Sequence, residues 1–99
     1  MPERLWTELL ESLAQRCPKE GLTFKRTTRN KGQVERKGTP LLQIWFDPAS
    51  RRPLSYELED GTRKEMGVVV TSEGQADFRL DGVSYSAERL ANTLIREIL

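Results

Sequence analysis

The chain contains no histidine and a single cysteine, and these two shortages exclude several common kinds of active site. Without histidine, serine–histidine and cysteine–histidine catalysis have no base, and the common zinc sites lose their nitrogen ligand. Cys17 has no second cysteine with which to form an internal disulfide. This favours a reducing compartment and predicts a cytoplasmic protein. We interpret Cys17 itself as a small apolar residue on a helix face.

Long apolar runs are also missing. No stretch approaches the ~20 residues that a membrane span needs, and the N-terminal sequence MPER lacks the apolar centre of a secretory signal. Apolar residues make up 36% of the chain and charged residues 31%, which is typical of a globular protein with a well-solvated surface. A chain of 99 residues has the usual size of one domain. We therefore expect a single domain over residues 1–99 that has no membrane segment.

What the sequence does contain is a series of short segments in which apolar and polar residues alternate. In residues 41–47, one side of an extended chain would carry Leu42, Ile44 and Phe46. This period of two is typical of a strand with one buried face. Similar alternation recurs in residues 54–58, 66–70 and 76–80. The four runs predict an antiparallel sheet with one covered face and one face in solvent.

A weaker hairpin pattern precedes these runs. Residues 22–28 favour a strand with Leu22 and Phe24 facing inward, and the sequence RNKG that follows is a turn signal. The return arm, residues 33–37, has only Val34 as an apolar residue. Later in the chain, two Asp-Gly pairs predict tight turns, and residues 83–85 form a last short arm.

Both ends of the chain show helical spacing of apolar residues. Residues 2–17 carry one apolar stripe, and Pro18 would end that helix. The stripe consists of Leu5 or Trp6, Leu9, Leu10, Leu13 and Cys17. Residues 87–99 favour a second helix with Ser86 as its N-cap. Its apolar side consists of Leu90, Ala91, Leu94 and Ile98, widened by Ile95 and Leu99.

These elements predict an α+β fold, a two-layer sandwich with an N-terminal helix, a sheet of five or six strands and a C-terminal helix. Short connections favour a meander in which sequence neighbours pair. The two helices are the only elements able to cover the apolar side of the sheet, so both should lie on the same face. This order of elements resembles that of frataxin-like domains and, more loosely, of small secretion chaperones. The resemblance is architectural and implies no function.

Strand parity places Trp45 on the open face of the predicted sheet. If Leu42 and Ile44 face the helices, Trp45 projects to the other side beside Gln43, and Arg79 falls on the same side. Tryptophan and arginine dominate the energetic centres of protein interfaces. We therefore predict a non-catalytic protein-interaction or adaptor module that binds a partner through Trp45, Gln43 and Arg79. The competing interpretation is that Trp45 only packs over arginine stems and Val69.

The middle of the chain is strongly basic, which suggests a second function. Residues 25–53 carry eight basic groups against two acidic ones. The eight are Lys25, Arg26, Arg29, Lys31, Arg36, Lys37, Arg51 and Arg52. Arginines can clamp phosphates and Trp45 could stack on a base, so weak binding to RNA or DNA is the alternative. A solvated edge hairpin whose charges prevent sheet-to-sheet pairing would give the same pattern.

No motif predicts an enzyme, a metal site or a cofactor. Glu57 and Glu59 fall on one side of a strand and could hold a hard cation, but as solvated partners of arginines they need no ligand. The outer rim of the last helix, Ile95 and Leu99, is a candidate contact for a second copy of the chain. The sequence thus predicts no catalytic residue, no cofactor and no metal ligand.

Overall fold

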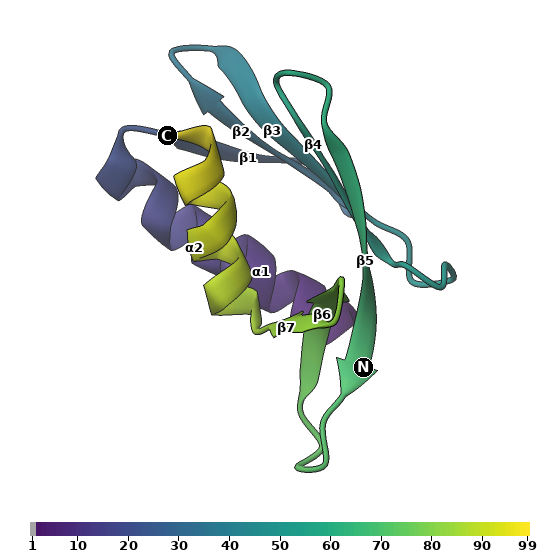
Figure 1. Cartoon of the computed structure of the whole chain (residues 1–99). Coiled ribbons are helices and arrows are strands. Elements are labelled where there is room, and N and C mark those ends of the chain that lie inside the picture. Colours follow the sequence, from purple (N-terminus) through teal and green to yellow (C-terminus); the bar gives the residue numbers. More distant parts are fainter. Residues whose placement is uncertain (1) are drawn as a thin grey trace.

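The computed structural model describes residues 2–99 and shows an antiparallel meander sheet covered on one face by two helices (Figure 1). Within these residues, seven strands follow one another across the sheet in chain order. The strands are β1 (Thr23–Thr28), β2 (Lys31–Arg36), β3 (Thr39–Phe46), β4 (Leu54–Leu58), β5 (Arg63–Val70), β6 (Ala76–Leu80) and β7 (Val83–Tyr85). The helices are α1 (Pro2–Arg16) and α2 (Ala87–Ile98), and a short 3₁₀ turn, η1 (Cys17–Glu20), follows α1. The predicted two-layer α+β architecture is confirmed.

The described sheet has seven strands rather than the five or six predicted. The weak return arm of the first hairpin is a full strand, β2, which pairs with both β1 and β3. Its apolar content is low because the ring of Phe24 on β1 fills the space above Gly32. The hairpin from β2 to β3 turns through Lys37 and Gly38, both with positive φ, which is the backbone of a tight two-residue loop.

Strand β5 connects two parts of the sheet. Its first half, Arg63–Met66, pairs with β4, and its second half, Gly67–Val70, pairs with β6. No residue of β5 is paired on both sides. Figure 1 shows β5 running past β4 to reach the β6–β7 hairpin at the other end of the molecule.

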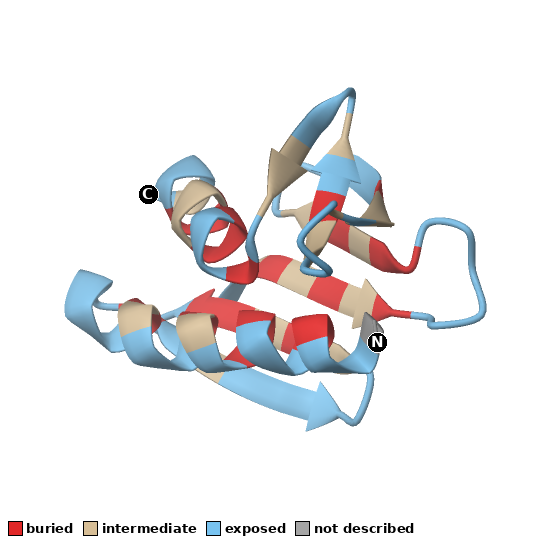
Figure 2. Ribbon diagram, turned by 90° about the horizontal axis from the view of Figure 1, so that it is seen from below, coloured by how far each residue is buried: buried red, intermediate tan, exposed pale blue. Residues whose placement is uncertain are grey.

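The core lies between the sheet and the helices, as strand parity predicts. The alternating residues of β3, Leu42, Ile44 and Phe46, are buried, and in Figure 2 the buried positions of the helices face the strands. Both Leu5 and Trp6 of α1 are buried, although the sequence pattern required only one of them. Trp6 stacks on Phe46 with ring centroids 5.4 Å apart.

The helix ends agree closely with the sequence signals. The α1 helix ends at Arg16, and Pro18 lies within η1, which Gly21 closes with a φ of 72°. The Oγ of Ser86 accepts a hydrogen bond of 3.1 Å from the backbone N–H of Arg89, so Ser86 is the N-cap of α2 as predicted. The Asp81-Gly82 turn has positive φ at both residues, as expected for a tight hairpin.

Candidate functional site

Trp45 lies on the face of the sheet opposite the helices. In the strand register it sits between Lys31 of β2 and Ser55 of β4. Its side chain is half-buried, whereas its neighbours Ile44 and Phe46 are in the core. The parity on which the interaction hypothesis depends is therefore present in the structure.

Two cations hold the indole of Trp45 on this face. The Lys31 Nζ lies 5.2 Å from the ring centroid, and the Arg63 guanidinium carbon lies 5.1 Å from it. Each such contact stabilises by about 0.5–1 kcal/mol at an exposed site, and the aliphatic stems shield part of the ring. The sequence suggests only a nucleic-acid role for Lys31 and none for Arg63, because cross-strand register is not visible in the sequence.

The surface around Trp45 carries amide side chains and charged side chains of both signs. One row across the sheet consists of Lys25, Gln33, Gln43, Glu57 and Arg63. The Glu35 carboxylate forms an ion pair with Lys25, with 3.2 Å between Nζ and Oε1. It also accepts a hydrogen bond of 2.5 Å from Nε2 of Gln33. A row of charged and amide side chains therefore runs beside one large aromatic side chain. We call the surface formed by Gln33, Gln43, Trp45, Glu57 and Arg63 the Trp45 face.

Arg79 shares the open side of the sheet but lies away from Trp45. It pairs with Gly67 across β5 and β6, and β4 and β5 separate its strand from β3. Three strand spacings amount to roughly 14 Å. Arg79 instead lines a hollow with Arg51 and Arg52. Val69, expected beside Trp45, lines that hollow too and pairs with Asp77.

The structure divides the eight basic groups of residues 25–53. Lys25 is paired with Glu35, and Lys31 lies over Trp45. Arg36 and Lys37 are at the end of the β2–β3 hairpin, away from the β1–β2 turn. That turn and the β3–β4 loop share the opposite end of the sheet, because the N–H of Phe46 donates to the carbonyl of Asn30 over 2.9 Å. Arg29, Arg51 and Arg52 belong to this second end, where Arg26 Nη2 donates to the carbonyl of Arg29 over 2.8 Å.

The described part of the chain contains no group of three or more Cys, Asp or Glu side chains placed to hold a metal ion. Glu57 is on β4, while Glu59 lies in the turn that follows that strand. In the same turn, the pKa of Asp60 is lowered because its carboxylate accepts a hydrogen bond of 2.8 Å from the backbone N–H of Thr62. This arrangement stabilises the turn.

Two titratable side chains lie in the core. Burial raises the pKa of the Cys17 thiol to about 11, so the group is a thiol at neutral pH and a poor nucleophile. Burial, with smaller contributions from Glu97 and Tyr85, raises the pKa of Tyr56 to about 12. The interpretation of Cys17 as a small apolar residue agrees with its complete burial, although it begins the 3₁₀ turn η1 rather than lying in α1.

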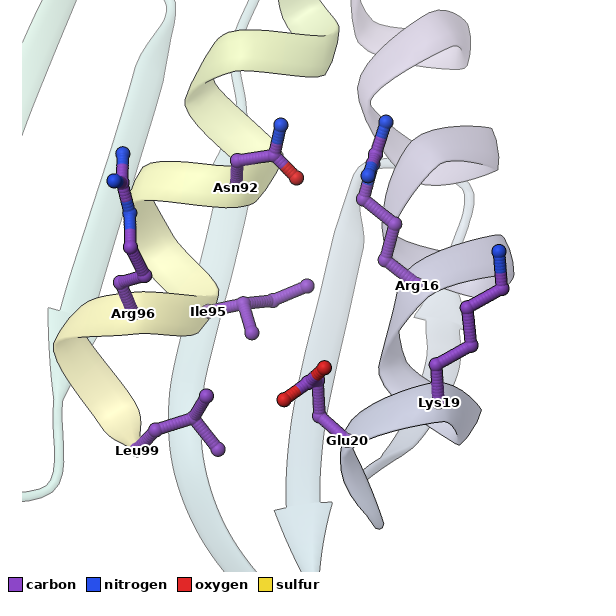
Figure 3. Close-up of a pocket in the computed structure, with 7 residues that line it drawn as sticks. All are labelled: Arg16, Lys19, Glu20, Asn92, Ile95, Arg96 and Leu99. Carbon is purple, nitrogen blue, oxygen red and sulfur yellow. The ribbon is translucent and has the colours of Figure 1, made fainter.

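A groove separates the C-terminal ends of the two helical segments (Figure 3). Ile95 and Leu99 provide its apolar surface, with Arg16, Lys19 and Arg96 around it. Ile95 is buried, whereas Leu99 is 56% exposed. Arg16 is engaged by Glu88 at 2.6 Å. The apolar rim expected at the end of α2 is therefore reduced to Leu99.

Comparison of the chain with family models, with curated proteins and with solved structures gave no significant match. Neither helix in residues 2–99 has the length and apolar character needed to cross a membrane.

Proposed function

We propose that the protein is a non-catalytic protein-interaction module that binds its partner through the Trp45 face. The observation that supports this most directly is the position of Trp45, a half-buried indole on the sheet face that the helices leave open. Aromatic and arginine side chains at the centre of a surface are the groups that contribute most to protein association.

The contacts around Trp45 reduce the cost of using it for binding. Lys31 and Arg63 already restrict the indole, so less side-chain freedom is lost when a partner covers it. Glu57 and Arg63 are cross-strand neighbours of opposite charge. A partner with a small apolar depression and charges of both signs around it fits this surface.

The test compares Trp45→Ala with a matched surface variant, Arg96→Ala, on the opposite layer of the molecule. Both variants and the unmodified protein are immobilised, exposed to lysate of the source cell and analysed by quantitative mass spectrometry. We expect one set of proteins to be retained by the unmodified protein and by Arg96→Ala but not by Trp45→Ala. Circular dichroism verifies that each variant is folded.

Two outcomes would contradict the proposal. Retention of the same proteins by all three forms would show that Trp45 makes no contact with a partner. Unfolding of the Trp45→Ala variant would show that the indole is a structural element of the sheet. A milder variant, Gln43→Ala, then serves as the second test of the same face.

Binding of RNA or DNA is the second candidate, favoured by the contact between Phe46 and Asn30 that brings two basic loops to one end of the sheet. The ion pair of Lys25 and the remote position of Arg36 and Lys37 reduce the charge available there. Affinity for a mixed oligonucleotide should then fall steeply as salt rises. A flat response to salt, or no binding, would exclude this candidate.

A further inference from the structure

Three arginines from two separate parts of the chain line one hollow on the open side of the sheet, next to β5 and β6. Arg51 and Arg52 come from the β3–β4 loop and Arg79 comes from β6. The hollow has a volume of about 360 Å³, within the usual range of roughly 300–1,000 Å³ for small-molecule sites. The Trp45 face is a different part of the same side.

Local hydrogen bonds close the loop that carries two of these arginines. The N–H of Asp47 donates to the carbonyl of Pro53 over 2.7 Å, and the Asp47 carboxylate accepts from the N–H of Ala49 over 3.0 Å. The loop leans over β5 at Gly67, where the carbonyl oxygen of Arg51 is 3.8 Å from the position a β carbon would take. At this distance a β carbon would make an ordinary van der Waals contact with the loop. Because Gly67 also pairs with Arg79, the loop and β6 meet at the same point.

The guanidinium groups in this hollow are free to bind a ligand. Among residues 2–99, the side chains of Arg51, Arg52 and Arg79 form neither an ion pair nor a hydrogen bond. Glu65 and Asp81 line the same hollow but lie outside ion-pairing distance of them. The five side chains together carry one net positive charge. They offer an excess of N–H donors and, separately, carboxylate acceptors.

We propose that this hollow binds a small phosphorylated molecule that also carries hydroxyl groups, such as a sugar phosphate. A guanidinium group can donate two parallel, charge-assisted hydrogen bonds to the oxygens of one phosphate group. Glu65 and Asp81 can only accept hydrogen bonds in their ionised form, so they suit the hydroxyl groups of the same ligand. With three arginines against two carboxylates, the hollow keeps a net positive charge that attracts a phosphate group.

The test uses calorimetric titration at fixed ionic strength with three probes: glucose 6-phosphate, inorganic phosphate and glucose. Glucose 6-phosphate should saturate one site, inorganic phosphate should bind at least threefold more weakly, and glucose should not bind. Arg79→Gln should weaken glucose 6-phosphate at least tenfold. The control Arg36→Gln removes an exposed arginine at the far end of the β2–β3 hairpin and should leave the affinity unchanged.

Each part of the proposal can fail separately. Equal weakening by Arg36→Gln would reveal diffuse charge attraction and overturn the site, as would the absence of saturable binding. Equal affinity for the sugar phosphate and for inorganic phosphate would overturn the role given to Glu65 and Asp81. If Arg79→Gln unfolds, the double variant Arg51→Gln/Arg52→Gln replaces it, and the same loss of affinity for glucose 6-phosphate is expected.

Discussion

The aromatic ring of Phe24 on β1 occupies the space that a side chain at position 32 of β2 would need. A β carbon built on Gly32 would stand 2.9 Å from Cε1 of Phe24 and 3.3 Å from Cγ1 of Ile44. Gly32 itself is buried and has an ordinary negative φ. The glycine is therefore required by packing rather than by backbone conformation.

Gly32→Ala should destabilise the protein by about 1–3 kcal/mol, because the ring of Phe24 must leave its position to admit the methyl group. Gly67→Ala is the matched control, since it is also a strand glycine but would meet only the carbonyl of Arg51 at 3.8 Å. We expect the control to change stability by less than about 0.5 kcal/mol. Urea denaturation measures both, and equal losses would contradict the packing argument.

The two tryptophans should differ sharply in their effect on stability. Trp6 is buried, stacks on Phe46 and donates from Nε1 to the carbonyl of Arg29 over 3.1 Å. Trp6→Ala should therefore cost about 3–5 kcal/mol. Trp45→Ala loses two exposed cation–π contacts and partial burial, which amounts to about 1–2 kcal/mol.

Fluorescence quenching provides an independent measure of where the two indoles lie. The Trp45→Phe protein, with Trp6 as its remaining tryptophan, should emit at shorter wavelength and resist quenching by iodide. The Trp6→Phe protein should be quenched readily. Resistance of the Trp6→Phe protein to iodide would mean that Trp45 is not accessible and would remove the basis of the Trp45 face.

Stability should fall as the pH rises from about 9 to 12. Burial raises the pKa of Cys17 from 9.0 to about 11 and of Tyr56 from 10.0 to about 12. The unfolded chain therefore loses these protons at lower pH than the folded chain does, and its ionisation favours unfolding. Below pH 8 neither group contributes to the pH dependence.

Tyr56→Phe removes one of the two groups, so the decline in the free energy of unfolding should become shallower between pH 10 and 12. Urea denaturation at pH 8, 10 and 11 measures the slope. A slope identical to that of the unmodified protein would show that Tyr56 titrates normally in the folded state.

Ser86→Ala should destabilise the protein by about 1 kcal/mol, because the N–H of Arg89 would lose its acceptor at the start of α2. Ser86→Asp should retain stability, since a carboxylate also caps and suits the positive end of the helix. Thermal unfolding distinguishes the two variants. A loss from both would indicate that the hydroxyl has a role other than capping.

The sequence predicts the architecture well because burial imposes a period on the chain. The alternation of Leu42, Ile44 and Phe46 identified β3 and its buried side, and Ser86 marked the start of α2. Strand β2 shows a weak pattern in the sequence because Phe24 supplies the apolar group that Gly32 lacks. That compensation comes from a neighbouring strand, so a reading of residues 33–37 alone cannot reveal it.

The candidate sites were only partly predictable, for a related reason. Parity placed Trp45 and Arg79 on the open side, but parity does not determine which strands are adjacent. The contacts of Trp45 with Lys31 and Arg63 depend on the register of three strand pairs. The meeting of Arg79 with Arg51 depends on the path of an irregular loop, for which the sequence gives no periodic signal.

Strand β5 connects two separate sets of backbone hydrogen bonds, because its partner changes from β4 to β6 between Met66 and Gly67. The β6–β7 hairpin can therefore open without breaking any backbone hydrogen bond among β1–β4. Its amide hydrogens should exchange with deuterium first. Arg51 and Arg52 belong to the β1–β4 part of the sheet, and Arg79 belongs to the β6–β7 hairpin. A ligand bound by all three arginines would link the two parts of the sheet. Glucose 6-phosphate should therefore slow the hydrogen exchange of β6 amides far more than that of β2 amides.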